Sequence, residues 1–206
     1  MNEITLSLVN TYTLRKQHLT ENSKINDIIQ IVKDIGGLHA TGSTPPYLSL
    51  FARTNHFIKA QLDEALYQKK QLGKIRFVRK TIYILPREFL PVAYAALKSI
   101  IELASERFSG YLGINREQYT ILSKSILELL GQGGKSTIEI KKALYTTLNI
   151  SPIVNLMCDQ GLLIRGKSKS GWKSNLHTYY LFQDYFPNLD LKSFDADEAR
   201  KVLVQQ

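Results

Sequence analysis

The chain has little cysteine and no cluster of metal-binding residue types. Its 206 residues include one cysteine, Cys158, which excludes an intramolecular disulfide and a cysteine-rich zinc site. The four histidines show no H-x-H or H-x-x-x-H pairing, so we expect no bound metal. Cys158 follows Met157 in an apolar segment without a nearby histidine, and we expect it to be a core residue instead of a nucleophile.

Membrane and nucleotide signatures are also missing. There is no run of 18 apolar residues and no signal-peptide pattern in the first 25 residues, so we expect a cytoplasmic protein with no membrane partner. The sequence has no G-x-x-x-x-G-K-[ST], no G-x-G-x-x-G after a strand and no G-x-S-x-G. We therefore expect neither a nucleotide cofactor nor any other cofactor.

Acidic residues are in deficit. Lysine and arginine number 27 against 18 acidic residues, which gives a net charge of +9 and favours a polyanionic partner, with nucleic acid as the first candidate. Hydrophobic residues make up 44% and charged residues 22%, values typical of a folded soluble chain. The length allows one large or two small domains.

The hydrophobic pattern of the first half predicts helices followed by a hairpin. Apolar residues recur at helical spacing in three segments, at residues 24–35, 47–53 and 59–71. Over residues 74–85 the period drops to two, with a turn near Arg79 and Lys80. Helices followed by a basic hairpin are typical of a winged helix.

The second half repeats this order. A connecting helix is predicted at 89–108, and three helices follow it. The first spans 116–130, the second begins at the capping box of Ser136 and Glu139, and the third begins at Ser151. A second hairpin comes after them. We predict a mainly α fold with small β-hairpins (α+β), built from tandem winged helix-turn-helix domains.

The predicted organisation has three parts. They are a first winged-helix domain at 1–90, a connecting helix with a second winged-helix domain at 91–187, and an acidic tail with the start of a further helix at 188–206. In this tail Asp195 and Glu198 can cap a helix that has no C-terminal cap, which is typical of a fragment or of a shortened relative.

Basic residues concentrate in the two predicted hairpins. No acid lies between Glu64 and Glu88, or between Asp159 and Asp184. Cations there would contact backbone phosphates of double-stranded DNA and release counterions, whereas the alternative is a solvated hairpin face that keeps the protein soluble. The predicted DNA-binding residues are Lys69, Lys70, Lys74, Arg76, Arg79, Lys80, Arg165, Lys167, Lys169, Trp172 and Lys173.

Two further expectations concern this interface. Trp172 either stacks on a base or wedges into a groove, or it packs beneath its own hairpin. Two tandem modules already supply two DNA contacts, so dimerisation is not required for binding.

A glycine-rich segment carries a polar pair. Within residues 36–42, His39 and Thr41 alternate about Ala40, so an extended backbone points both side chains to one side. An imidazole and a hydroxyl held together can position a water molecule. The alternative is that Thr41 begins a turn and His39 is an ordinary loop histidine.

Four segments resemble the AlkZ/YcaQ-type winged-helix DNA glycosylases. They read LRKQHL at 14–19, IGGLHATGSTPPYLSLFAR at 35–53, AQLDEALY at 60–67 and IRFVRKTIYILPREFLP at 75–91. The resemblance extends over nearly the whole chain and is strongest over residues 14–91. It implies tandem winged helices around duplex DNA and a monofunctional glycosylase that removes bulky alkylated purines, in some members from both sides of an interstrand crosslink.

The sequence departs from the family pattern at the motif that carries the family's catalytic residues. In the family the glycine pair is followed by Leu-Gln-x-Gln, whose two glutamines hold the hydrolytic water and steady the cationic sugar. The resemblance therefore implies His39 and Thr41 as the catalytic residues, since histidine accepts a proton from water and threonine hydrogen-bonds it. Either this pair serves the reaction on different lesions, or the chain is a relative that binds DNA without cleaving it.

Two other departures bear on DNA binding. The Arg-Gly-Thr of the family's first wing reads Arg79-Lys80-Thr81 here, and the family's third winged helix has no counterpart. We expect a nucleoid-associated DNA repair protein. The rival functions are a non-enzymatic transcriptional regulator or architectural DNA-binding protein, which prefers a sequence over a lesion, and a protein-binding module, whose binding ignores salt.

Overall fold

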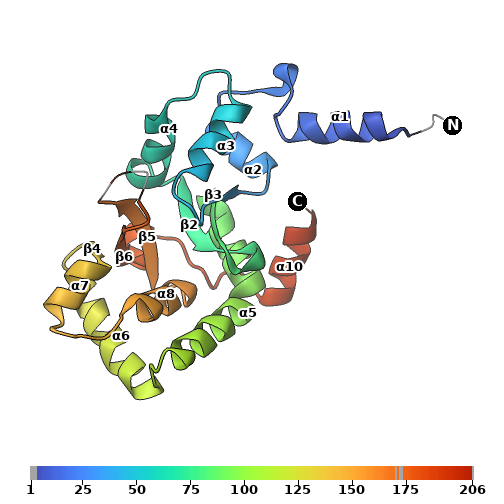
Figure 1. Cartoon of the computed structure of the whole chain (residues 1–206). Helices are drawn as coiled ribbons and strands as arrows, with labels where there is room; N and C mark the ends of the chain where they lie inside the picture. The colour runs from blue at the N-terminus through green and yellow to red at the C-terminus, as the bar shows by residue number, and fades with distance from the viewer. Residues whose placement is uncertain (1–3, 170, 172–173, 206) are drawn as a thin grey trace.

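Two units of the same topology follow one another in the computed structural model, which describes residues 4–169, 171 and 174–205 (Figure 1). Each unit runs helix, short strand, helix, helix and hairpin. In each, the short strand pairs with the last strand, giving the strand orders β1-β3-β2 and β4-β6-β5. The predicted α+β class and the tandem winged helix-turn-helix plan are thus confirmed.

The first unit follows its hydrophobic pattern closely. Its elements are α2 (Ile28–Asp34), β1 (Leu38–His39), α3 (Pro45–Arg53), α4 (Lys59–Asp63) continued by a π-helical turn η2 (Glu64–Gln68), β2 (Leu72–Arg76), the hairpin turn η3 (Val78–Lys80) and β3 (Ile82–Pro86). The helix predicted from residue 24 begins at Ile28, because the Asp27 carboxylate accepts hydrogen bonds from the N–H groups of Ile29 and Gln30 and so caps the helix there.

The second unit begins after a long helix. A short turn η4 (Arg87–Phe89) leads into α5 (Leu90–Tyr111), and the unit then comprises α6 (Arg116–Leu130), β4 (Lys135–Ser136), α7 (Thr137–Ala143), α8 (Ser151–Asp159), β5 (Leu163–Ser168) and β6 (His177–Leu181). The predicted capping box is present: the Glu139 carboxylate accepts from the N–H of Ser136, and the Ser136 hydroxyl accepts from the N–H of Glu139.

The turn of the first hairpin requires an unusual backbone. Arg79 and Lys80 have φ angles of 56° and 57°, in the left-handed region that glycine adopts without strain. A glycine in place of Lys80, as in the family pattern, therefore suits this turn physically. In this chain the position is instead occupied by Lys80, whose side chain is exposed.

One hydrophobic core joins the two units. It combines residues of the first hairpin, of α5 and of the second hairpin, including Phe77, Leu85, Leu90 and Ile164. The chain after the second hairpin completes it, since α9 (Phe182–Tyr185) and α10 (Ala196–Gln205) pack against the same core, with α10 along α5 (Figure 1). The predicted cap of α10 is also present, because the Asp195 carboxylate accepts from two backbone N–H groups.

A buried ion pair crosses the same junction. Arg76 of β2 donates to the carboxylate of Asp159, at the end of α8, at 2.8 Å, and to the hydroxyl of Ser105 of α5 at 2.8 Å. The Asp159 side chain is 1% exposed and that of Arg76 is 21% exposed. This contact links three elements that are far apart in the sequence.

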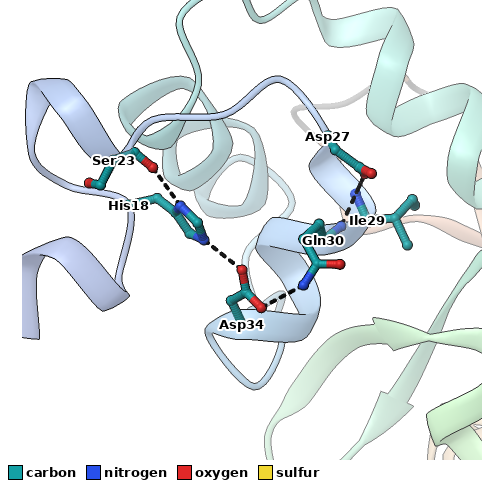
Figure 2. Close-up of polar contacts among 6 residues, drawn as sticks. All are labelled: His18, Ser23, Asp27, Ile29, Gln30 and Asp34. Carbon is teal, nitrogen blue, oxygen red and sulfur yellow. Dashed lines mark hydrogen bonds and ion pairs between the residues drawn. The ribbon is translucent and has the colours of Figure 1, made fainter.

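A polar cluster follows the N-terminal helix. Helix α1 (Leu6–Lys16) was not predicted, has no buried residue and extends away from the rest of the molecule (Figure 1). In the segment that follows it, which includes η1 (Glu21–Ser23), His18 contacts the Ser23 carbonyl through Nδ1 at 2.7 Å and the Asp34 carboxylate through Nε2 at 2.8 Å (Figure 2). Both partners are hydrogen-bond acceptors, and each ring nitrogen faces one of them.

Among the helices of the described residues, none has the length and hydropathy that crossing a bilayer requires.

Removal of one partner of the buried ion pair is expected to destabilise the fold. In Asp159→Ala the half-buried guanidinium of Arg76 loses its counter-ion, so the free energy of unfolding should fall by about 3 kcal/mol in urea denaturation. The double variant Arg76→Met/Asp159→Leu removes both charges and should recover most of that loss. Wild-type stability of Asp159→Ala would contradict a structural role for the pair.

The strained turn yields a second stability prediction. Lys80→Gly relieves the left-handed backbone and should raise the free energy of unfolding by about 1 kcal/mol. Lys80→Ala removes the same side-chain charge but keeps the strain, and we expect little change. Equal stabilisation by both variants would show that the charge, and not the backbone, is responsible.

Candidate nucleic-acid interface

The glycine pair sets the position of the predicted catalytic residues. Gly36 and Gly37 have φ angles of 69° and 110°, where α2 ends and the chain turns into β1. A Cβ on Gly37 would lie 2.5 Å from Leu85 Cδ2 and 3.1 Å from the carbonyl oxygen of Ile84. Only glycine fits this approach to β3, and the turn places His39 at the end of the edge strand β1.

His39 and Thr41 lie together, as the alternation of their side chains predicts. The Thr41 hydroxyl oxygen is 3.2 Å from His39 Nε2 and accepts a hydrogen bond from the N–H of Ile82 at 3.3 Å. The His39 ring also packs edge-on against Tyr83, with ring centroids 5.5 Å apart. Both residues are exposed, so a water molecule has access to the pair.

The hydrogen-bond pattern limits what this pair can do. Because the Thr41 oxygen already accepts from Ile82, its proton is available for His39 Nε2, and the ring then carries its own proton on Nδ1. With the opposite tautomer, Nε2 donates to Thr41 and Nδ1 becomes a free acceptor. In the first form the ring's one acceptor nitrogen is occupied by Thr41, so only the second form leaves an imidazole nitrogen free to accept a proton from water.

Three of the predicted DNA-binding cations are exposed and have no ion-pair partner among the described residues. They are Arg79 and Lys80, at the tip of the first wing, and Lys167, near the end of β5 in the second wing. Such side chains can approach a phosphate without breaking an existing contact.

Three more have weak partners at the surface. Lys69 lies 3.1 Å from the Glu64 carboxylate, Lys169 pairs with Glu139, and the Lys70 ammonium lies 4.5 Å from the centre of the Tyr185 ring. Surface ion pairs of this kind contribute little to stability and exchange easily for a phosphate.

Arg76 and Arg165 correct the prediction that all basic residues of the hairpins face DNA. Arg76 is held by Asp159, and Arg165 is 3% exposed and donates to the Asn155 side chain at 2.7 Å. The alternation of β5 turns Arg165 into the protein, where hydrogen bonds compensate the burial of its charge. The predictions for Trp172 and Lys173 lie outside the described residues.

Lys74 is also directed inward. Its Nζ donates to the Tyr67 hydroxyl at 2.7 Å, and burial lowers the pKa of the ammonium to about 8, although the Asp63 carboxylate opposes that shift. Nothing in the local sequence distinguishes Lys74 from its exposed neighbours, since the burial comes from the second unit.

Lys74 lines a polar pocket between the two units. The first unit contributes Ser43, Tyr47, Asp63 and Tyr67, and the second contributes Lys167 and His177. The Tyr47 hydroxyl donates to the Asp63 carboxylate at 2.7 Å, and Lys59 pairs with the other oxygen of that carboxylate. Sequence analysis missed this pocket, because its walls come from segments about a hundred residues apart.

His177 forms the far wall of this pocket. It is 8% exposed, and its Nδ1 has no hydrogen-bond partner in the described part of the chain. Burial, together with the charges of Lys74 and Arg165, lowers the pKa of the ring to about 4, so the imidazole is neutral at pH 7.

Over residues 4–169, 171 and 174–205, no group of three or more His, Cys, Asp or Glu side chains is arranged to hold a metal ion.

Comparison with known proteins places the chain in a family. The family described as DNA glycosylase AlkZ-like matches residues 32–206. Among solved structures, Streptomyces sahachiroi DNA glycosylase AlkZ superposes with a TM-score of 0.76 at 14% sequence identity, over 98% of this chain and 56% of that one. This likeness shows a common fold, and the chain spans about half the length of that structure. No curated protein matches the sequence.

The family match covers most of the chain, including β1, both wings and α10. It agrees with the resemblance found in the sequence segments around the glycine pair and the first wing. The chain belongs to the AlkZ-like DNA glycosylase family.

Proposed function

We propose that this chain binds duplex DNA through its two wings and hydrolyses the N-glycosidic bond of alkylated bases, with His39 and Thr41 as its catalytic residues. The observation that carries the proposal is the His39–Thr41 hydrogen bond, at the positions of the family's two water-holding glutamines. Membership of the family supports the reaction, and the exposed cations of the wings support the substrate.

The proposed reaction needs little help from the protein at the leaving base. An alkylated purine is already cationic, so the bond between the sugar C1′ and the base nitrogen breaks without protonation of the base. The resulting oxocarbenium-like sugar then needs a water molecule on its open face and a polar environment. His39 and Thr41 would hold that water, and the imidazole would accept its proton as the new C1′–O bond forms.

In this proposal the two wings bind the DNA backbone. Arg79 and Lys80 of the first wing and Lys167 of the second would contact backbone phosphates, with Lys69 and Lys169 exchanging their carboxylate partners for phosphate. Bulky alkylated purines, including crosslinked ones, are the proposed lesions, because the His39–Thr41 pair lies on an exposed strand edge and not in a closed base pocket. One copy of the chain suffices, and the protein would act at the nucleoid.

A second function is favoured by the replacement of both glutamines. The same fold would then serve as a non-enzymatic DNA-binding protein, regulatory or architectural, in which His39 and Thr41 are turn residues. Such a protein would bind a preferred sequence whether or not a lesion is present.

The roles of the pair can be tested by single-turnover base release from heavily methylated duplex DNA. We expect His39→Ala to slow release by about 100-fold or more, through loss of the proton acceptor. Thr41→Val should slow it by about tenfold, the effect of one lost hydrogen bond, and Thr41→Ser should restore it. DNA affinity should stay within twofold of wild type in all three.

Two further variants sharpen this test. Lys124→Ala, on the exposed face of α6, is the matched control and should release base at the wild-type rate. The double variant His39→Gln/Thr41→Gln restores the family's residues and should release base at least as fast as wild type. Equal rates in His39→Ala and wild type would exclude the proposed role, and no release by wild type with intact duplex binding would favour the second function.

The proposed phosphate contacts predict a salt dependence. Replacement of Arg79 or Lys167 with alanine should each reduce the slope of log K against log salt concentration by about 0.9, because one fewer counterion is released. Arg165, which is buried, is expected to make no such contribution. Fluorescence anisotropy of a labelled duplex measures the slopes, with Lys124→Ala as control, and slopes unchanged in both wing variants would contradict these contacts.

A further inference from the structure

A cleft on the second unit contains polar groups that the proposed function does not use. It lies where α5 and α6 diverge from the turn at residues 112–115, with α8 between the two helices (Figure 1). Its volume is about 630 Å³, which is in the range of sites that bind a small organic molecule. Neither His39 nor Thr41 lines it, and no residue of either wing does, so this cleft is a separate site.

The wall that α5 contributes contains a buried hydroxyl without a partner. Ser109 is 4% exposed, and its Oγ has no hydrogen-bond partner among the described residues. A buried polar atom in this state is costly, and it is explained where a water molecule or a ligand supplies the missing hydrogen bond. Because Ser109 lines the cleft, such a partner would lie in the cleft.

The same face of α5 carries two carboxylates. Glu102 and Glu106 are one helical turn apart, and Glu106 is one turn before Ser109. Neither carboxylate forms an ion pair within the described part of the chain. Burial, together with the charges of Glu102 and Glu106, raises the pKa of the Tyr119 hydroxyl to about 12, so both carboxylates lie close to this side chain of the cleft. Ionised carboxylates only accept hydrogen bonds, so this wall favours a ligand with N–H donors.

The wall that α6 contributes favours the opposite kind of group. Arg116 is the first residue of α6, is exposed and has no ion-pair partner over residues 4–169, 171 and 174–205. The side-chain oxygen of Asn115 caps the helix by accepting from the N–H of Gln118, which leaves its NH₂ group as a donor. The N-terminus of a helix also carries a partial positive charge. Hydrogen-bond acceptors are therefore favoured on this side.

Apolar side chains and a fixed ring line the cleft between these two walls. Ile114 and Leu156 line it and are 9% and 3% exposed. The Tyr119 hydroxyl donates to the side-chain oxygen of Gln160, at the end of α8, and this contact holds the tyrosine ring in place. A flat, partly apolar molecule can pack against such a surface.

These properties together restrict the ligand. The carboxylates of Glu102 and Glu106 disfavour a phosphate, and Arg116 disfavours a simple cation. An α-amino acid carries both charges but is much smaller than the cleft. The remaining class is an uncharged, planar molecule with N–H donors on one edge and acceptors on the adjacent edge.

We propose that this cleft binds a guanine base, free or in a nucleoside, with its N1–H and N2–H₂ donors on the Glu106 carboxylate and its O6 and N7 acceptors toward Arg116 and Ser109. Arginine pairs with O6 and N7 of guanine in DNA complexes by the same geometry. Adenine has an acceptor at N1 and a donor at N6, so its edges do not match these two walls. The proposal does not depend on glycosylase activity of the chain.

Titration of the full chain with guanosine tests this site. The nucleoside is uncharged, so the exposed cations of the wings do not attract it as they would a phosphate. Isothermal titration calorimetry should give a Kd of about 0.1 mM for guanosine, a value typical of a ligand of this size. Inosine, which lacks the N2 amino group, should bind about fivefold more weakly, and adenosine at least about tenfold more weakly.

Amide chemical shifts give the location of binding. In ¹⁵N-labelled protein, guanosine should shift the amide signals of Ser109, Arg116 and Tyr119. The signals of the wing residues Arg79 and Lys167 should not move.

Two charge variants test the walls separately. Glu106→Gln should weaken guanosine binding about tenfold, because the charged acceptor of two N–H groups is lost, and Arg116→Gln should weaken it about fivefold. The matched controls are Glu128→Gln on α6 and Arg15→Gln on α1, both exposed and outside the cleft. Both controls should bind guanosine like wild type.

Ser109→Ala separates a ligand contact from a structural role. Removal of a hydroxyl that has no partner in the protein should leave the Tm at or above that of wild type, whereas guanosine affinity should fall about fivefold. A lower Tm with unchanged affinity would show a structural hydroxyl and overturn its role in binding.

The other outcomes of the titration also decide the proposal. Absence of saturable guanosine binding at up to about 1 mM, or equal affinity for adenosine, would overturn the guanine assignment. Amide shifts confined to the wings would place the ligand elsewhere and overturn the site. Saturation of the cleft by an amino acid, tested with glutamine and glutamate, without guanosine binding would overturn the ligand class.

Discussion

The buried pair of Arg76 and Asp159 fixes the arrangement on which the other features depend. It joins the first hairpin to α8 beside the shared core, and burial raises the pKa of the Asp159 carboxyl while the charge of Arg76 acts against that rise. A buried charge without its counter-ion destabilises a protein strongly, so this pair favours the relative placement of the two units in which Arg76 contacts Asp159. The pair and the shared core thus lie between the two wings and contribute to their relative placement.

The sheet of the first unit separates two kinds of chemistry. Strand alternation turns His39 toward the outer face and Lys74 toward the helices, so a hydroxyl–imidazole pair and a buried amine lie on opposite sides of three short strands. The outer pair is open to solvent, whereas the inner pocket is small and lined by polar side chains of both units.

Local patterns in the sequence predicted most elements and the closeness of His39 and Thr41, and long-range contacts account for what they missed. The Ser136 capping box and the alternation of His39 with Thr41 are local, and the structure contains both. Whether a basic side chain is exposed or buried depends on contacts between distant segments. Arg165 and Lys74 belong to basic hairpins, yet packing of the two units buries them. The unpredicted α1 buries no residue, and its apolar side chains, such as Leu8 and Tyr12, are exposed, so no packing against the core marks it as a helix.

The most direct test of the account is a count of the abasic sites that the wild-type protein forms in a duplex with one bulky alkylated guanine, compared with the same duplex unmodified. The account predicts that abasic sites appear only in the modified duplex, at the position of the lesion, and in proportion to the bound protein. Tight, salt-sensitive binding to both duplexes with no abasic site in either would contradict it and leave a DNA-binding protein without glycosylase activity.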